Sequence, residues 1–421
     1  MMPTELVPEL GLLRSELSPA LRAMTRTPGS EARSAGRILL VDSLRGFALL
    51  GLFLVHCLEY FELYWRHPER SHIHNAVDLV FADKAYAVFA LLFGLSFFLI
   101  MDRQARKGVD FSRRFAWRLL LLAGIGYLYS LIYVSEILQV LALLGLSLLL
   151  FNKMASRSLL ILSFLFLLQP HLLFLALSAF WDGGRDASPV QWAALYARAA
   201  DIFAQGSFWQ VAEFNLWQGQ MFKWFYIIES PRIASFGTLF IWGLLLGRIG
   251  FFAARKQYLP QRRWILTFSL VAAALLYAGK TDFEASPLLV GSGNPRIYLL
   301  MVLESWLAIA VAISGVLIFM EAYEFRPLRR LAVLLAPCGQ MSLTIYVAQG
   351  LLCVPLFYGY GLGWYQHIGQ ERALLFGLLT FAAMAWGARL WMRHFRYGPL
   401  EWLWRCGTYC SLRVPLRRSP A

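Results

Sequence analysis

Apolar segments of 18 or more residues recur along nearly the whole 421-residue chain. A helix of this length matches the hydrocarbon thickness of a bilayer. A transmembrane β-barrel would show short segments of alternating polarity instead, and the sequence has none that we can identify. With 59% hydrophobic residues, the chain is also too apolar for a soluble enzyme of this length. The sequence therefore predicts an all-α bundle of transmembrane helices.

Ten spans are predicted, and basic residues gather on every second connection between them. The connection after the second span, for example, holds Arg103, Arg106 and Lys107. By the positive-inside rule, this alternation places both termini in the cytoplasm. The predicted spans are about 37–65, 79–101, 115–133, 136–151, 157–180, 223–250, 264–279, 298–320, 331–352 and 372–393.

The same pattern divides the chain into five parts. Residues 1–36 are polar, with scattered prolines, and are predicted to form a disordered cytoplasmic tail. Residues 37–180 carry the first five spans, and 181–222 form an outer loop with helices that lie at the membrane surface. Residues 223–394 form a C-terminal membrane domain, and 395–421 form a cytoplasmic amphipathic helix and tail.

Several classes of function are disfavoured. The formal charge of +14 is explained by basic loops, so we expect no nucleic-acid partner. Five cysteines without a C-x-x-C pair indicate neither a disulfide framework nor a metal site. Motifs of nucleotide-driven pumps, of α/β-hydrolases and of zinc proteases are absent from the sequence.

The first span carries a polar stripe. Asp42, Arg45 and His56 fall within an arc of about 60° on a helix, although Asp42 and His56 are about 21 Å apart along its axis. Charged residues inside a span usually face protein or water rather than lipid. The stripe therefore predicts a polar path from the inner mouth of the bundle to its outer third.

Each residue of the stripe has two interpretations. Asp42 and Arg45 can form a charge pair at the membrane interface, or they can recognise an anionic donor or solute at a cytoplasmic mouth. His56 can act as a general base on a hydroxyl group, or it can simply hydrogen-bond neighbouring helices.

Further candidate residues lie in the outer halves of later spans. Glu136, Glu304 and the pair Glu229 with Arg232 are substrate-site candidates, because intramembrane acids are commonly functional. In the ninth span, Tyr346 and Gln349 suit either helix contacts or a polar substrate.

Two further features allow a structural or a functional interpretation. Glu401 and Arg405, at i and i+4 on a short amphipathic helix, belong to an interfacial anchor or to a cytoplasmic lid over Asp42 and Arg45. His72 and His74 follow His67 in a polar loop, where a solvated role is favoured over metal binding.

Four segments resemble the YeiB-like family of bacterial inner-membrane proteins, whose C-terminal half is a domain of unknown function. The segments are DSLRG at 42–46, Lys84 followed by FALLFGLSF, GQMSLTIYVAQGLL at 339–352 and FRYGPLEWLWR at 395–405. The chain departs from the family pattern at His56, at Ser135-Glu136 and at Ile345. The resemblance implies a multi-pass protein of the bacterial inner membrane.

The first two spans are also similar, more distantly, to those of membrane acyltransferases of the heparan-glucosaminide N-acetyltransferase type. These enzymes use a catalytic histidine in the loop after span one, where this chain has His67, His72 and His74. Their Asp-Leu-Val-Phe is matched at residues 78–81. This resemblance implies catalytic roles for His72, His74 and Asp78.

Two functional hypotheses follow. In the first, the protein transfers an acyl group from acetyl-CoA or another cytoplasmic acyl-CoA to an envelope glycan or lipid, with Arg45 orienting the donor and a histidine as base. In the second, it transports a small polar or anionic solute along Asp42, Arg45, Glu136 and Glu304. Both need the lipid bilayer as partner. Neither requires a bound cofactor, and the oligomeric state is left open.

Overall fold

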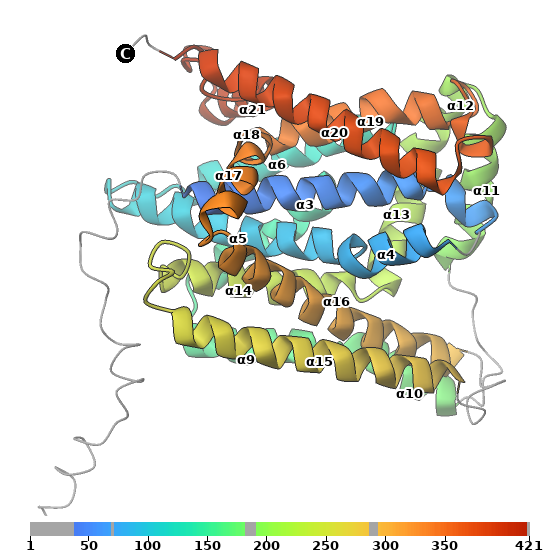
Figure 1. Ribbon diagram of the computed structural model, residues 1–421, viewed down its shortest axis with the longest axis horizontal. Coiled ribbons are helices and arrows are strands. Elements are labelled where there is room, and N and C mark those ends of the chain that lie inside the picture. The colour runs from blue at the N-terminus through green and yellow to red at the C-terminus, as the bar shows by residue number, and fades with distance from the viewer. Residues whose placement is uncertain (1–37, 69–70, 182–190, 286–293, 419–421) are drawn as a thin grey trace, which may run out of the picture.

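The computed structural model describes residues 38–68, 71–181, 191–285 and 294–418 (Figure 1). These residues form helices and one isolated bridge, between Phe395 and Arg417, but no strand. The predicted all-α fold is therefore confirmed. The predicted disordered tail at 1–36 lies outside the described residues.

The helices follow one another with short connections. They are α3 (Leu39–Leu58), η1 (Leu63–Arg66), α4 (His72–Phe81), α5 (Lys84–Ala105), α6 (Ser112–Ser130), α7 (Leu138–Gly145), α8 (Ser147–Phe151), α9 (Ser156–Leu167), α10 (Pro170–Trp181), α11 (Gln191–Gln205), α12 (Phe208–Leu216), α13 (Gln218–Glu229), α14 (Arg232–Arg248), α15 (Leu259–Ala285), α16 (Asn294–Ala322), α17 (Arg326–Leu334), α18 (Ala336–Gln340), α19 (Ser342–Phe357), η3 (Trp364–Gln366), α20 (Gly369–His394) and α21 (Pro399–Tyr409).

Six helical segments in the described part of the chain are long and apolar enough to cross a membrane. They are Leu39–Arg66, His72–Ala105, Ser156–Trp181, Leu259–Ala285, Pro295–Ala322 and Gly369–His394. The other four predicted spans correspond to α6, to α14 and to two shorter apolar stretches, Leu138–Phe151 and Ser342–Phe357. The protein is thus a multi-pass helical membrane protein. The count of ten spans and the cytoplasmic termini stay predictions.

One predicted span begins further along the chain than expected. The segment 331–352 is divided, because α17 ends at Leu334, α18 contains Pro337, and Met341 leaves the helical conformation with φ −120° and ψ 44°. The apolar helix in this region is therefore α19, Ser342–Phe357. Proline removes a backbone donor and favours such breaks.

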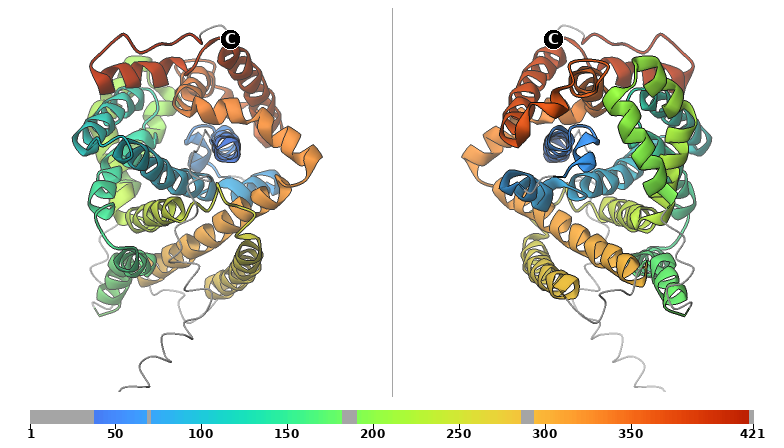
Figure 2. Two further views of the ribbon diagram at one scale, coloured as in Figure 1. Left: turned by 90° about the vertical axis from the view of Figure 1, so that its left-hand side faces the viewer. Right: turned by 90° about the vertical axis from the view of Figure 1, so that its right-hand side faces the viewer.

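Helix α3 lies at the centre of the bundle. Viewed along its axis, it is surrounded by the other long helices (Figure 2). In the most apolar 18-residue window of the segment that contains α3, 61% is buried inside the protein. In the corresponding window of α15, at the periphery, only 6% is buried. Helix α3 packs mainly against α18, α20, α5 and α4. Among the six candidate spans of the described residues, the one with the polar stripe is therefore the most enclosed by protein, whereas α15 faces outward.

The bundle has two distinct ends. We call the end where α3 begins the inner end and the end where α3 stops the outer end. The basic connections after α5, α14 and α16 lie at the inner end, on the left of Figure 1. At the outer end, α11 and α12 lie across the helix ends, next to η1 and α13. They fall in the stretch where helices at the membrane surface are predicted.

The centre of the bundle depends on a close crossing between α3 and α18. A Cβ atom on Gly339 would overlap the carbonyl oxygen of Asp42, and one on Gly46 would overlap that of Leu335. Only glycine permits this approach, as in other close-packed membrane helices. By contrast, a Cβ atom on Gly387, in the exposed part of α20, would meet no atom within 4 Å.

Replacing Gly339 by alanine is expected to lower the free energy of unfolding by about 1–3 kcal/mol, because the added methyl group forces the two helices apart. Gly387→Ala is the matched control, and it should be neutral or stabilising by up to about 1 kcal/mol. Thermal unfolding of the detergent-solubilised variants measures both. Equal midpoints for the two variants would contradict the role assigned to this crossing.

Candidate functional site

The chain leaves the outer end of α3 through an unusual turn. Tyr60, Phe61 and Glu62 have φ values of 51°, 52° and 85°, all in the left-handed region. For residues with side chains this conformation costs roughly 1–2 kcal/mol each. Such strain is concentrated at functional sites when the surrounding structure enforces it. The turn buries the Phe61 ring and brings the Glu62 carboxyl group back toward Tyr133, in the connection that follows α6.

The turn completes a group of polar side chains, which we call the outer cluster: His56, Glu59, Glu62, Tyr133 and Ser135. The Tyr133 hydroxyl donates to Glu62 Oε1 at 3.0 Å, and Ser135 also hydrogen-bonds this carboxyl group. The His56 ring packs edge-on against the Tyr133 ring, with 5.2 Å between centroids. A half-buried histidine thus lies beside a tyrosine that is bonded to a carboxylate.

A cation lies next to this cluster. Arg232 Nη2 pairs with Asp83 Oδ1 at 2.9 Å and donates to the Tyr226 hydroxyl at 3.0 Å. Its guanidinium also lies over the Tyr86 ring, 4.4 Å from the centroid. Glu59 and Glu62 are within electrostatic range of Arg232. The structure thus brings the predicted residues His56 and Arg232 to the same region of the outer end.

Sequence reasoning missed several members of this region. Glu59 and Glu62 follow His56 within two helical turns, so the rule that intramembrane acids are functional candidates would have found them. No pattern in the sequence pointed to Tyr133, because its place beside His56 depends on how α6 packs. Glu229, the predicted companion of Arg232, accepts a 3.5 Å hydrogen bond from the backbone of Trp192.

Glu136 has a different environment from the outer cluster. Its Oε1 pairs with Lys223 Nζ at 2.9 Å, and both side chains are almost fully buried. Its Oε2 accepts hydrogen bonds from the first backbone N–H groups of α7, Leu138 and Gln139. This carboxylate is therefore engaged on both oxygens and holds α7 against α13.

Two predicted residues of α19 lie in the same buried layer. The Tyr346 hydroxyl accepts a 3.1 Å hydrogen bond from the backbone N–H of Ile137, next to Glu136. Gln349 is 1% exposed, and neither end of its amide has a hydrogen-bond partner among the described residues. A buried amide without partners is costly, so this position favours a polar ligand or a water.

The loop histidines lie on α4, outside the outer cluster. Ser71 caps this helix by accepting hydrogen bonds from the N–H groups of Ile73 and His74. The His74 ring stacks on Tyr64 with centroids 4.3 Å apart, whereas His72 is exposed. Asp78 follows His74 by one turn and is itself exposed. His74 and Asp78 therefore form a second histidine–carboxylate arrangement at the outer end.

At the inner end, Arg45 joins three helices. It donates to Asp42 Oδ1 at 3.4 Å on α3, to the Gly339 carbonyl at 3.2 Å on α18 and to Ser96 Oγ at 2.8 Å on α5. The predicted charge pair between Asp42 and Arg45 is therefore present. These contacts also stabilise the crossing of α3 and α18.

Glu401 acts on another helix end. Its Oε1 accepts hydrogen bonds from the N–H groups of Leu343 and Thr344, and its Oε2 accepts one from Thr344 Oγ1 at 2.6 Å. A carboxylate suits the positive end of α19. Burial raises the pKa of Glu401, and these hydrogen bonds oppose the rise. Arg405 lies over the Tyr397 ring, so each member of the predicted lid pair has its own partner.

Glu304 is not brought to the outer cluster. It pairs with Lys280 Nζ at 2.8 Å across α15 and α16, and its side chain is half exposed. Figure 1 places these helices in the layer opposite α19 and α20. That Asp42, Arg45, Glu136 and Glu304 line one transport path stays a prediction. Groups of three or more potential metal ligands are absent from the described residues.

Replacing Lys223 by methionine is expected to destabilise the protein by about 3–5 kcal/mol, because the Glu136 charge stays buried without its partner. Arg66→Met is the matched control, since Arg66 pairs with Asp201, whose side chain is 68% exposed. That exposed pair is worth at most about 1 kcal/mol. Thermal and denaturant unfolding in detergent compare the two, and equal losses would contradict the assignment of Glu136 as a structural carboxylate.

Comparison with known proteins separates the two halves of the chain. Residues 37–180 match the family described as heparan-alpha-glucosaminide N-acetyltransferase, catalytic. Residues 246–411 match the family described as protein of unknown function (DUF418). The first match contains the outer cluster, both loop histidines and Arg45, whereas the second contains α19 and α21.

Individual bacterial proteins are also similar to this chain. YxaH of Bacillus subtilis (strain 168) is 27% identical over 402 residues, which cover 89% of this chain and 95% of the relative. A 39.9 kDa protein from the amylase 3′ region of Bacillus acidopullulyticus is 24% identical and covers 89% of this chain and 94% of the relative. YeiB of Escherichia coli (strain K12) is 40% identical over 76 residues, 18% of this chain and 19% of YeiB. No solved structure matches the chain. The predicted resemblance is confirmed: this membrane protein is similar to YeiB over part of its length, to DUF418 proteins in its C-terminal half and to an acetyltransferase catalytic family in its N-terminal half.

Proposed function

We propose that this protein transfers an acyl group from a cytoplasmic acyl-CoA, such as acetyl-CoA, to a hydroxyl group of an envelope glycan or lipid at the outer end of the bundle. The observation that carries the proposal is the similarity of residues 37–180 to an acetyltransferase catalytic family. That stretch contains α3, and α3 places a half-buried histidine edge-on against a tyrosine whose hydroxyl is bonded to the Glu62 carboxyl group.

In the proposed reaction, His56 accepts a proton and then returns it. As general base, it takes the proton of the acceptor hydroxyl while the oxygen attacks the thioester carbonyl carbon. A C–O bond forms, the C–S bond breaks, and the imidazolium returns the proton to the departing thiolate. Glu62, held by Tyr133 and Ser135, favours positive charge on the ring through the Tyr133 side chain that lies between them in this contact chain.

Other residues have binding roles in this proposal. Arg232 and Glu229 bind the acceptor at the outer end, and the amide of Gln349 bonds the acyl donor within the bundle. Arg45 marks the inner entrance, about 16 Å from His56 along α3. The donor therefore needs a long flexible arm, which acyl-CoA has. We place the protein in the inner membrane of a bacterium, with both termini in the cytoplasm.

The structure offers two histidines for the base. His56 lies inside the bundle beside Tyr133, whereas His74 lies on α4 with Asp78 one turn away. The resemblance to acetyltransferases favours the loop position of His72 and His74. The depth of His56 favours His56, because a site shielded from bulk water protects the thioester from hydrolysis.

We expect His56→Gln to lower the rate of acyl transfer by at least about 100-fold with little change in the apparent KM for acetyl-CoA, because the base acts only in the transition state. The assay supplies radiolabelled acetyl-CoA to sealed inside-out vesicles that contain the protein and measures label in the glycan and lipid fractions. His367→Gln, at an exposed histidine between α19 and α20, is the matched control and should retain full activity.

Each alternative outcome has a distinct meaning. Loss of transfer in His74→Gln but not in His56→Gln would move the base to α4 and Asp78. If wild-type vesicles incorporate no more label than vesicles without the protein, acyl transfer from acetyl-CoA is refuted. Uptake assays with small anionic solutes would then test the transport hypothesis.

A further inference from the structure

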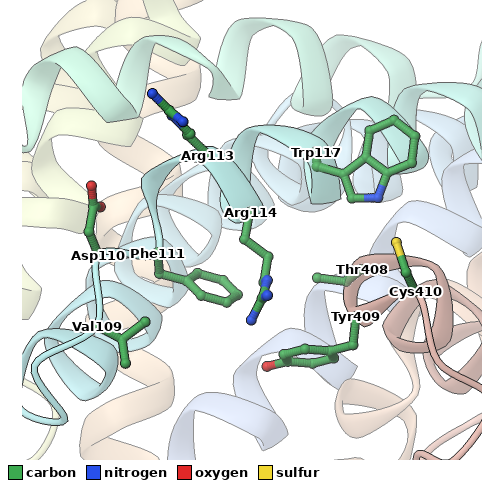
Figure 3. Close-up of a pocket in the computed structure, with 9 residues that line it drawn as sticks. All are labelled: Val109, Asp110, Phe111, Arg113, Arg114, Trp117, Thr408, Tyr409 and Cys410. Atoms are coloured by element: carbon green, nitrogen blue, oxygen red, sulfur yellow. The ribbon is translucent and has the colours of Figure 1, made fainter.

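A cavity of about 460 Å³ opens at the inner end, away from the outer cluster. We call it the inner pocket. It lies between the start of α6 and the end of α21, which is held on α6 by a hydrogen bond from Trp117 Nε1 to the Gly407 carbonyl. Its lining residues are Val109, Asp110, Phe111, Arg113, Arg114, Trp117, Thr408, Tyr409 and Cys410 (Figure 3).

The charges of the inner pocket favour an anion. Arg113 and Arg114 are both exposed and leave α6 in different directions, with Arg114 toward Tyr409, 5.4 Å from the ring centroid (Figure 3). The lining carboxylate, Asp110, accepts a 2.9 Å hydrogen bond from the N–H of Ser112, which lowers its pKa. One carboxylate is therefore engaged locally, while two guanidinium groups border the cavity. Guanidinium groups suit phosphate oxygens.

An apolar stripe continues from the pocket along α6. Trp117, Leu120 and Leu128 are 45%, 49% and 67% exposed, and a Cβ atom on Gly124 would meet nothing within 4 Å. Together with Arg113 these residues fall within about 80° of the helix circumference. The stripe therefore leads from the basic pocket toward the middle of the membrane, with a notch at Gly124.

We infer that the inner pocket and the stripe bind an anionic phospholipid, whose phosphate pairs with Arg114 beside Tyr409 and whose acyl chain follows α6, while Arg113 adds positive charge at the rim. A soluble phosphate compound would use the arginines but would leave the apolar stripe uncovered. A lipid satisfies both features at once, and tryptophan and tyrosine are typical of the interfacial level where a headgroup lies. Basic pockets at cytoplasmic helix ends are known to bind such headgroups.

Binding of dioctanoyl phosphatidylglycerol to the full-length protein in detergent tests this inference by native mass spectrometry. We expect it to bind at least about tenfold more tightly than dioctanoyl phosphatidylcholine, and Arg113→Gln/Arg114→Gln to abolish that preference. Arg103→Gln removes an exposed charge on α5 outside the pocket and is the matched control, which should keep the preference. Thermal unfolding checks that each variant is folded.

The location of the bound lipid has its own readout. Cys410 lines the pocket and is exposed, whereas the other four cysteines of the chain are buried. Phosphatidylglycerol should slow alkylation of Cys410 by N-ethylmaleimide several-fold, and phosphatidylcholine and glycerol phosphate should not. Cys410→Ser defines the background of this reaction.

Three results would overturn the inference: equal binding of the two lipids by the wild type, an unchanged preference in the double variant, or binding without protection of Cys410. Tight binding of adenosine 3′,5′-bisphosphate in place of the lipid would show that the pocket serves a soluble nucleotide. All of these measurements are independent of acyl transfer, so they do not depend on the proposed function.

Discussion

A polar group carried into the membrane by a helix needs a partner inside the protein, because hydrocarbon offers none. This constraint explains the arrangement around α3. Arg45 hydrogen-bonds to two neighbouring helices. Glu136 pairs with Lys223 and accepts hydrogen bonds from the N-terminus of α7, and Glu401 accepts hydrogen bonds from the N-terminus of α19. The glycine crossing of α3 and α18 brings one of these partners, the Gly339 carbonyl, within reach of Arg45. Polar contacts and close packing therefore depend on each other.

The outer end of α3 differs from this pattern. Here the chain keeps three successive left-handed residues, a half-buried histidine and several carboxyl groups close together. Strain and incompletely buried charge are both costly, and structural needs alone do not require them. This arrangement lies in the half of the chain that is similar to an acetyltransferase catalytic family. The amide of Gln349, which has no hydrogen-bond partner in the part of the chain that the structure describes, adds a second position that favours a ligand over apolar packing.

Part of the site could be predicted and part could not. The stripe of Asp42, Arg45 and His56 follows from helical periodicity, and all three residues lie on the most enclosed of the six candidate spans in the described residues. Convergence could not be predicted: Arg232 lies near the outer cluster, whereas Glu304 pairs with Lys280 in another layer. Both are charged residues in outer halves of spans, so the sequence pattern treats them alike. Only the packing of α14 and α16 distinguishes them.

By itself, the sequence determined the fold class, the approximate places of the spans and the helix that carries the polar stripe. These properties depend on local hydrophobicity and on helical periodicity, which a linear pattern contains. The tertiary structure decided which charges are closed in structural pairs, that Tyr133 and Glu62 lie beside His56, and that α6 and α21 enclose a basic pocket. These contacts join residues far apart in the chain, and they exist only because particular helix faces pack together.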